Sequence, residues 1–150
     1  MKGGEGTRND RKRVLFVCIG NACRSQMAEA FARAYGSDVM IPASAGLAPA
    51  IRVAPSTIQA MGEKNLDLKH HFPKSIPQLG RARFDLVVNM SGYQIPIPME
   101  ARVDSWDVKD PVSLSYEEHC KVRDEIEGLV MRLVLEVRRD QGSSAGGKQG

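Results

Sequence analysis

The chain has 150 residues, of which 42% are hydrophobic and 26% charged, a balance typical of one globular domain and unlike that of disordered or fibrous chains. The formal net charge of +3 is small, so the basic cluster at residues 8–13 predicts a solvated tail, and we expect no nucleic-acid partner. Without an apolar run near the ~20 residues of a membrane span, a secretion signal or a disulfide framework, the chain is expected to be cytoplasmic and to bind no membrane.

The predicted elements start after a basic tail at residues 1–12, which is polar, rich in glycine and expected to be disordered. Residues 14–17 form a continuous apolar run, which is typical of a parallel strand buried on both faces. A helix is predicted over residues 24–35, because apolar side chains recur there at helical spacing and Gly36 is placed to end it.

Three more strands and a second helix are predicted in the middle of the chain. Residues 39–43, 85–90 and 101–106 are short segments whose apolar residues favour strands. The second helix is predicted over residues 55–64, with Pro55 near its start, where the missing N–H costs nothing.

The last helix is the clearest element of the sequence. Ser115 and Glu118 form a capping-box pattern, in which two side chains satisfy free backbone donors at the start of a helix. An apolar stripe follows at helical spacing: Val122, Ile126, Val130, Leu133 and Val137. Residues 141–150 are predicted to be a disordered tail rich in glycine and serine, which leaves residues 13–140 as a single catalytic domain, expected to be a monomer.

The alternation of strands and helices predicts an α/β fold, with a four-stranded parallel sheet flanked by helices on both faces. In such sheets, ligands bind outside the carboxyl ends of the strands. The segment after the first strand therefore lies at the active end of the predicted sheet.

That segment has the composition of an anion-binding loop. It consists of Cys18, Ile19, Gly20, Asn21, Ala22, Cys23, Arg24 and Ser25. Successive backbone N–H groups can converge on one oxyanion at the start of a helix, where the helix dipole also favours negative charge. Arg24 adds a planar fork that can bind two of the oxygens. We predict that residues 19–24 bind a phosphate-like oxyanion.

Cys18 is the predicted nucleophile of this loop. It lies at the base of the positive field, which favours the thiolate form. Ser25 can donate a hydrogen bond to the sulfur and steady it as a leaving group. In the alternative interpretation, Cys18 is a buried strand-end residue and Arg24 a surface charge. A cysteine, five intervening residues, then arginine and serine, between a buried strand and a helix, favours the anion-binding loop.

Asp110 is the predicted proton donor, since an ester's leaving oxygen must be protonated. It follows the fourth predicted strand, and so lies at the same end of the sheet, and Pro111 restricts its backbone. Asp104 and Asp107 are nearby alternatives. By spacing alone, a turn-forming Asp-Pro explains the dipeptide more simply.

Taken together, these residues resemble the low-molecular-weight protein tyrosine phosphatase superfamily, including its thioredoxin-coupled arsenate reductase branch. The resemblance covers residues 14–138, nearly the whole predicted domain. Its anchors are the segment 14–25, Ser44-Ala45-Gly46, and Asp110-Pro111 ahead of a long final helix.

The resemblance implies a thiolate nucleophile at Cys18, phosphate binding by Arg24 with the loop amides, and a general acid at Asp110. This implication favours the catalytic interpretation of the aspartate over a simple turn. It also implies that Asn21 holds the loop in shape through hydrogen bonds, with Ser44 as a partner.

Several stretches resemble the arsenate reductase branch more closely: residues 26–30, 44–50 and 66–68. Some members of that branch bind potassium, and the similar positions here are Asn21, Glu29, Ser44 and Asp67. Oxygen ligands of this kind suit a hard cation. The alternative is a Glu29 on the helix surface and an Asp67 in a turn. No cofactor is required, and potassium would be structural.

Two departures from the family pattern matter. The arsenate branch carries a pair of redox cysteines just beyond the third strand, whereas residues 90–96 contain no cysteine. The phosphatase branch usually has an aromatic residue on the loop after Ser44-Ala45, whereas residues 47–51 contain none. Val112 also replaces the tyrosine that often follows Asp-Pro.

We predict a phosphomonoesterase that acts on phosphotyrosine proteins or small aryl phosphates, through a cysteinyl-phosphate on Cys18 and with Asp110 as general acid and then base. The alternative is an arsenate reductase that uses an external thiol of the glutathione or mycothiol type in place of the missing cysteine pair. Arsenate is a tetrahedral oxyanion like phosphate, so the loop binds either. A non-catalytic phosphate-binding module is the third possibility. The presence of both Cys18 and Asp110 argues against it, because binding alone requires neither residue.

The remaining cysteines and histidines carry smaller predictions. Cys23 lies on the same tight loop as the nucleophile and is its predicted redox partner. Cys120 lies on the flank of the apolar stripe of the last helix and is expected to pack there, and His119 is expected to be partly buried and hydrogen-bonded. His70 and His71 either brace the loop or form a surface pair.

Overall fold

Four parallel strands form the centre of the fold. The computed structural model describes residues 10–149, with the backbone alone for residues 143–149. The strands are β1 (Lys12–Cys18), β2 (Met40–Gly46), β3 (Leu86–Asn89) and β4 (Arg102–Ser105), in the spatial order β2-β1-β3-β4. Because β1 lies inside the sheet, its residues 14–18 are all buried, as the continuous apolar run predicted.

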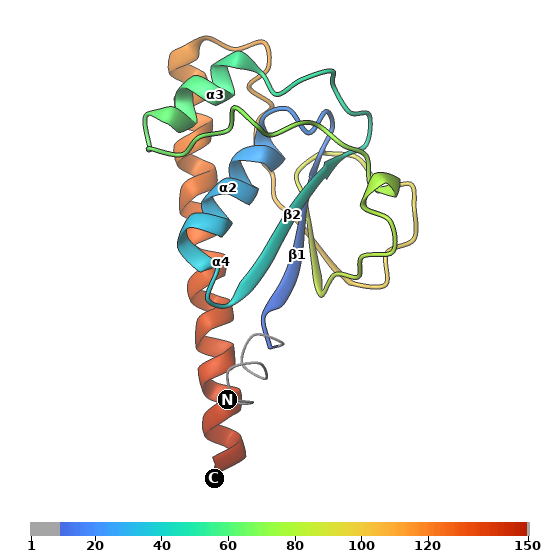
Figure 1. Cartoon of the computed structure of the whole chain (residues 1–150), viewed down its shortest axis with the longest axis vertical. Coiled ribbons are helices and arrows are strands. Elements are labelled where there is room, and N and C mark those ends of the chain that lie inside the picture. The colour runs from blue at the N-terminus through green and yellow to red at the C-terminus, as the bar shows by residue number, and fades with distance from the viewer. Residues whose placement is uncertain (1–9, 150) are drawn as a thin grey trace.

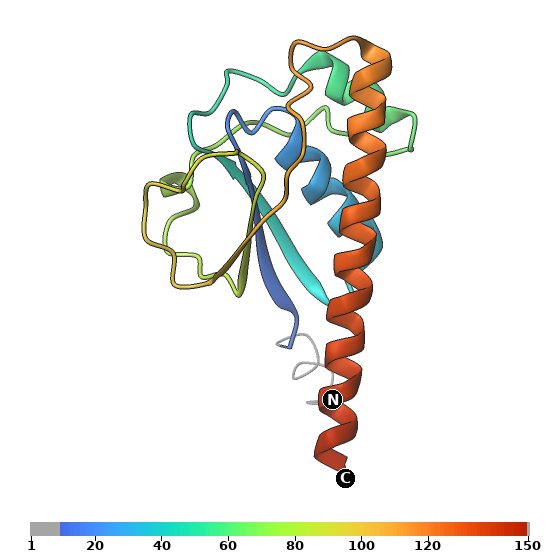
Figure 2. The ribbon, with the colours of Figure 1, turned by 180° about the vertical axis from the view of Figure 1, so that it is seen from behind.

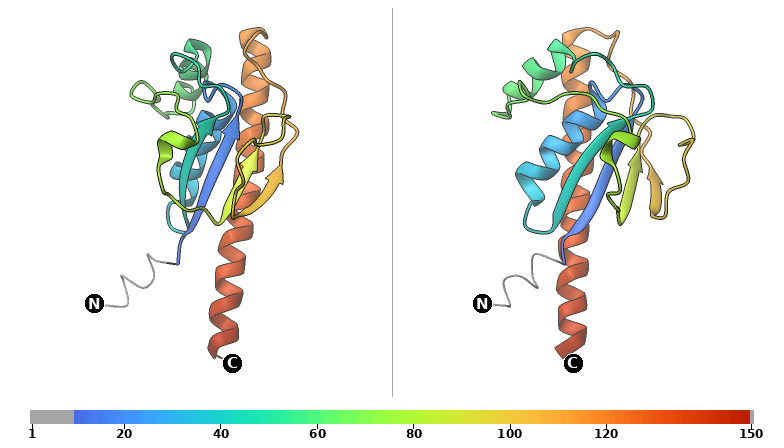
Figure 3. Two further views of the ribbon diagram at one scale, coloured as in Figure 1. Left: turned by 90° about the vertical axis from the view of Figure 1, so that its right-hand side faces the viewer. Right: turned by 45° about the vertical axis from the view of Figure 1, so that its right-hand side comes forward.

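Two helices pack against one face of the sheet, and a third lies near its carboxyl end. The helices are α2 (Arg24–Gly36), α3 (Pro55–Gly62) and α4 (Tyr116–Gln149). Figures 1 and 3 show α2 and α4 side by side against the sheet, with the C-terminal part of α4 continuing beyond the sheet. Phe16 of β1, Phe31 of α2 and Ile126 of α4 belong to one buried cluster between these layers.

The other face of the sheet has a thinner cover. Leu15, Val17 and Val87 point to that side and pack against a short 3-10 helix, η1 (Pro77–Leu79), and the loops around it. The predicted four-stranded parallel sheet with flanking helices is confirmed, although the second face carries only the single turn η1, which the sequence did not predict.

Gly36 is the last residue of α2, as predicted, but a glycine is needed there for packing and not for its backbone conformation. Its backbone does not take the left-handed conformation that such glycines usually supply. A side chain at this position would instead meet the Val134 Cγ2 atom of α4 at 2.7 Å. The glycine therefore allows α2 and α4 to pack closely.

β2 is longer than predicted. It runs to Gly46 rather than to residue 43, and pairs with β1 along its whole length, with Ser44, Ala45 and Gly46 opposite the last three residues of β1. These residues are small or polar, so strand propensity gave no signal, but pairing with the buried β1 extends the strand. The result is that Ser44 lies directly beneath the loop after β1.

The structure departs from the predicted disordered tails at both ends of its described part. Of the tail predicted at residues 1–12, residues 1–9 lie outside the described part, and Lys12 already pairs in β1. The tail predicted from residue 141 is instead helical as far as Gln149, because extending an existing helix costs much less than starting one. Within residues 10–149, no helix is both long enough and apolar enough to cross a bilayer.

The carboxyl ends of the strands define one end of the molecule. Figure 2 shows the loop after β1, α3 and the beginning of α4 gathered there. The Ser115 cap of α4 is present, since Glu118 N donates to Ser115 Oγ at 3.1 Å. Residues 106–115, which include Asp110, are thereby led back to the same end as Cys18.

Candidate active site

The loop between β1 and α2 is compact and is bonded to the segment that follows β2. Asn21 has a positive φ of 52°, a left-handed conformation that asparagine tolerates better than most residues. Four backbone bonds attach the loop to the segment after β2, among them Leu47 N to Cys18 O at 3.1 Å and Ala48 N to Ile19 O at 2.8 Å. The other two join Ala50 N to Gly20 O at 2.9 Å and Ala54 N to Ala22 O at 3.1 Å.

Gly46 is required where β2 passes beneath this loop. A Cβ atom there would lie 2.8 Å from Ile19 O and 2.9 Å from Asn21 N, distances that real side chains do not reach. Because both obstacles are backbone atoms, the loop itself would have to move.

We therefore expect Gly46→Ala to lower the free energy of unfolding by about 1–3 kcal/mol, the usual cost of overpacking, and to weaken phosphate binding. Denaturant unfolding and a phosphate thermal-shift titration measure the two effects. Gly62→Ala is the matched control, since nothing lies within 4 Å of its Cβ position, and it should be neutral or slightly stabilising. An unaltered phosphate affinity in Gly46→Ala would contradict this account of the loop.

Cys18 ends β1 and its thiol is held by the start of α2. Cys18 is buried, and its Sγ lies 2.9 Å from Ser25 Oγ. Asn21 Nδ2 donates to Ser25 Oγ at 2.7 Å, so the serine hydroxyl hydrogen is directed toward the sulfur. Asn21 Nδ2 also donates to Ser44 Oγ at 3.0 Å, the contact that the family resemblance implied. This chain of bonds presents a hydrogen-bond donor to the sulfur of Cys18.

Arg24 is buried at the first position of α2. Its Nη1 atom donates to two backbone carbonyls, Met90 O at 2.5 Å and Val108 O at 3.0 Å, which fix the guanidinium in place. Among the described residues, Arg24 Nε is the buried side-chain polar atom that has no hydrogen-bond partner. A buried charged donor without a partner is costly, so it points to a ligand that supplies the acceptor.

Asp110 lies beside this guanidinium. Its Oδ2 is 3.4 Å from Arg24 Nη2, and its Oδ1 accepts a bond from Val112 N at 3.1 Å. Of the two alternatives, Asp104 pairs with Arg102 on β4 at 3.0 Å, and Asp107 lies on the wall of a neighbouring cavity. The structure thus brings Asp110, and neither alternative, into an ion pair with the arginine of the loop.

Cys23 is a second buried thiol in the loop. Burial is the main cause that raises its pKa to about 11, while the Thr57 hydroxyl lowers it and the charges of Asp110 and Cys18 raise it. Cys23 is therefore a thiol at neutral pH, unlike the form expected of the nucleophile.

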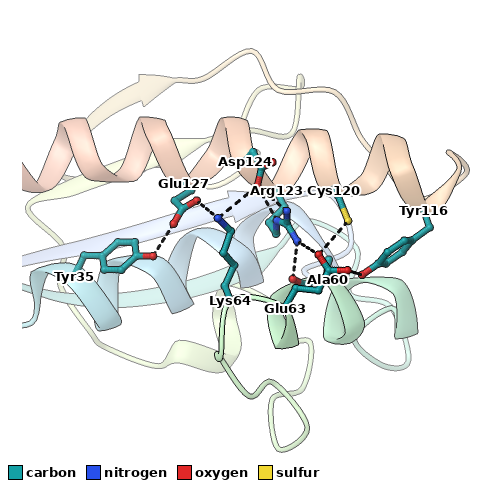
Figure 4. A network of polar contacts seen from close by, with 9 residues as sticks. All are labelled: Tyr35, Ala60, Glu63, Lys64, Tyr116, Cys120, Arg123, Asp124 and Glu127. Atoms are coloured by element: carbon teal, nitrogen blue, oxygen red, sulfur yellow. Dashed lines mark hydrogen bonds and ion pairs between the residues drawn. The ribbon is translucent and has the colours of Figure 1, made fainter.

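Cys120 lies elsewhere, in a polar network that joins α4 to α2 and to the end of α3. Figure 4 shows its sulfur directed toward Glu63, at 4.0 Å from Oε1, beside the ion pair of Glu63 with Arg123. The network also contains Tyr35, Ala60, Lys64, Tyr116, Asp124 and Glu127. Cys120 is a half-buried residue of α4, in agreement with the expectation that it packs on the flank of this helix.

The predicted potassium ligands come together only in part. Asn21 and Ser44 are hydrogen-bonded, and Ser44 Oγ donates to Glu29 Oε1 at 2.5 Å. Arg33 already supplies a positive charge to Glu29, at 2.8 Å. Asp67 is exposed and accepts a bond from the backbone N–H of Lys69. The potassium site therefore stays a prediction.

A cavity of about 700 Å³ lies between the loop after β3 and the residues that follow β4. Arg24 forms part of its wall together with Trp106, whose ring packs against Phe16 at 6.0 Å between centroids. Tyr93 also lines this cavity and is 65% exposed. The guanidinium can therefore be approached from this side.

The sequence missed one residue that shapes the loop. Gln26 is fully buried, and its Nε2 lies 3.1 Å from both Asn21 O and Asn21 Oδ1. Its Oε1 lies 3.0 Å from His71 Nδ1, so His71 braces the loop through Gln26, while His70 is exposed. A glutamine on the inward face of an otherwise apolar helix was the available signal.

The comparisons with known proteins identify the family. The low molecular weight phosphotyrosine protein phosphatase family matches residues 13–143, and the chain belongs to this family of enzymes. A glutaredoxin arsenate reductase from Synechocystis sp. is 32% identical over 130 residues, 84% of this chain and 98% of that protein. An arsenate reductase from Bacillus cereus is 36% identical over 121 residues, 78% of this chain and 90% of the relative.

A solved structure described as an arsenate reductase in the phosphate binding state has a TM-score of 0.75 and 31% identity, and the match covers 84% of this chain and 98% of that one. The interpretation of the chain as a phosphomonoesterase is therefore wrong, because these relatives and this structure are arsenate reductases. The phosphotyrosine substrate predicted with it loses its support. The exposed Val112 and the absence of an aromatic residue at 47–51 agree with the correction.

Proposed function

We propose that the chain reduces arsenate to arsenite, with Cys18 as nucleophile and an external low-molecular-weight thiol as the source of electrons. The observation that carries the proposal is the buried Arg24 Nε without a partner, at a loop that presents Cys18. The arsenate reductases that match nearly the whole chain support arsenate over other oxyanions.

The first step is attack on arsenic. The loop amides and the Arg24 fork hold the oxyanion, and the Cys18 thiolate forms a bond to As(V) as one As–O bond breaks. Asp110 is placed beside Arg24 to protonate the departing oxygen, which leaves as water. The product is a Cys18–S–As(V) adduct.

The second step is a two-electron reduction. A second sulfur attacks Cys18 Sγ and forms a disulfide, the S–As bond breaks, and its electron pair stays on arsenic, which leaves as arsenite. A further thiol then reduces the disulfide and restores Cys18. Residues 90–96, beyond β3, contain no cysteine to carry the disulfide outward, so the proposal assigns this last task to an external thiol.

The test is a coupled arsenate reduction assay with three donor systems: glutathione with glutaredoxin, mycothiol with mycoredoxin, and thioredoxin with its reductase. We expect arsenite to form with at least one small thiol, and thioredoxin alone to be at least about tenfold slower, since thiol exchange depends on access to the attacked sulfur. The Cys18→Ser variant measures the background rate of arsenite formation.

The outcomes separate the two parts of the proposal. If no donor yields arsenite above the Cys18→Ser background, the chain is not an arsenate reductase. If thioredoxin alone is as fast as the small thiols, arsenate reduction stands but the external small thiol does not.

Asp110→Asn should lower the rate of adduct formation by about 10²-fold, the lower end of the range for a lost general acid. The amide cannot donate an acidic proton but keeps the shape and the contact with Val112 N. Rapid-mixing measurement of adduct formation at saturating arsenate isolates this step. Asp107→Asn is the control, and equal losses in the two variants would remove Asp110 from the mechanism.

A further inference from the structure

The two edges of the sheet differ in how well they are covered. β2 forms one edge and is mostly buried. Pro42 of this strand has no N–H, its carbonyl accepts a bond from Arg33 at 3.1 Å, and Gly46 N donates to Lys74 O at 2.8 Å. β4 forms the other edge, where three of its four residues are exposed, and Figure 3 shows it as the outermost strand. An uncovered edge of this kind can pair with a further strand.

The register with β3 shows which backbone groups of β4 face outward. Ser105 lies opposite Asn89, and Trp106 N donates to Asn89 O at 3.0 Å. Because alternate residues of a parallel strand bond to the same neighbour, Asp104 directs its N–H and C=O toward β3, whereas Val103 and Ser105 direct theirs outward. Within the described part of the chain, these outward groups have no hydrogen-bond partner.

The side chains of β4 make this edge complementary to itself. Arg102 and Asp104 form an ion pair at 3.0 Å, while Val103 points to the other face of the sheet and is 45% exposed. If two β4 strands pair antiparallel about Val103, Arg102 lies opposite Asp104 of the second copy, and the reverse holds on the other side of the axis. Pairing about Arg102 or about Asp104 would place like charges opposite each other, which is destabilising. The charges therefore favour the register centred on Val103.

We propose that β4 is an interface between two copies of this chain, which pair antiparallel about Val103 and join their sheets across a two-fold axis. Val103 of each copy donates to and accepts from Val103 of the other, and the charges of Arg102 and Asp104 alternate in sign along the contact. Because the strand is short, the dimer is weak and reversible. The inference goes beyond the proposed function, does not depend on it, and replaces the expectation of a monomer.

The alternative is that the charges protect the edge. Charged side chains on an edge strand often prevent it from pairing with another chain, and Arg102 and Asp104 already neutralise each other within one copy. A protected edge predicts a monomer at every protein concentration. An interface predicts a dimer whose stability depends on the signs of the two charges.

The experiment is sedimentation equilibrium of the full chain over a wide range of protein concentrations. We expect wild-type protein to show a reversible equilibrium between monomer and dimer. Arg102→Asp and Asp104→Arg should each weaken the association at least about tenfold, because each reversal places like charges opposite each other on both sides of the two-fold axis. The double variant, Arg102→Asp with Asp104→Arg, should restore the dimer. An equal mixture of the two single variants should form mixed dimers.

A second pair of variants tests the backbone bonds. Val103→Pro removes an N–H that faces outward and makes no bond to β3, so the fold should persist while the dimer is lost. Val103→Thr keeps the shape and the N–H, and should associate as wild type does. Circular dichroism and the melting temperature show whether Val103→Pro is folded, and the charge reversals test the interface even if it is not.

Two outcomes would overturn the interface. If wild-type protein stays monomeric at every concentration, the charges of β4 are the protective pair. If a dimer forms that neither charge reversal weakens, its contact lies on another surface. None of these measurements involves arsenate, so they leave the proposed function to its own test.

Discussion

Replacing Cys18 with serine is expected to lower arsenate turnover by about 10⁴-fold or more while phosphate binding persists, because removal of a covalent nucleophile costs on that order. A serine hydroxyl beside Ser25 and Asn21 stays protonated, so it cannot attack arsenic. The loop amides and Arg24, to which the proposed function assigns the oxyanion, are untouched. Arsenite release measures the first effect, and the rise in melting temperature with added phosphate measures the second.

Cys120→Ser is the matched control, since it makes the same change in the network of Figure 4, away from the loop. It should keep wild-type turnover within about twofold, as expected of a surface substitution. Turnover of Cys18→Ser within tenfold of wild type would remove the nucleophile from the mechanism. Loss of the phosphate effect on melting would instead show that Cys18 holds the loop together.

The parts of the fold with the strongest local signals could be predicted from sequence. The run Val14–Val17 is apolar at every position because β1 has neighbours on both sides and layers on both faces, and this alone located the sheet and the loop after it. The apolar stripe of α4 predicted the last helix in the same way. Ser44 and Gly46 belong to β2 because they pair with β1, and their residue types alone gave no indication of a strand.

In the candidate site, the positions of Cys18, Arg24 and Asp110 could be predicted because Cys18 ends β1 and the other two residues follow the carboxyl end of a strand. Their detailed geometry could not. The Arg24 contacts with Met90 O and Val108 O join residues 66 and 84 positions apart, and both acceptors are backbone atoms that carry no residue type. Long-range contacts to backbone leave no pattern in a single sequence.

The contact between Thr57 and His119 is a second long-range contact that a single sequence does not reveal. His119 interrupts the apolar face of α4, which indicated a buried histidine with a partner, but its partner could have been any polar group of the layers nearby. Only the packing of α3 on the beginning of α4, visible in Figures 1 and 2, brings Thr57 to it. The substrate could not be predicted from the residues of the loop, because phosphate and arsenate are both tetrahedral oxyanions that the same donors would bind.

Arg24→Lys is expected to lower kcat/KM for arsenate by about 10³-fold, in the range reported for an arginine that stabilises a transferring oxyanion. The lysine ammonium can replace Nη1 in its bonds to Met90 O and Val108 O, so the fold should persist. It cannot replace the fork of Nε, which has no partner, and Nη2, which is paired with Asp110, and the proposed function assigns the oxyanion to this fork. Steady-state kinetics with the best thiol donor measure the loss.

Arg123→Lys is the control, because Arg123 is also buried and paired with an acid, Glu63, but belongs to the network of Figure 4. It should lose stability without losing turnover. Phosphate at about 100 times its Kd stabilises a protein that binds it by about 2.7 kcal/mol, and this effect should vanish in Arg24→Lys while surviving in Cys18→Ser and Arg123→Lys. That pattern would divide the loop into an arginine that binds and a cysteine that reacts. If phosphate protects Arg24→Lys as fully as wild type, Nε has another partner and the anion lies elsewhere.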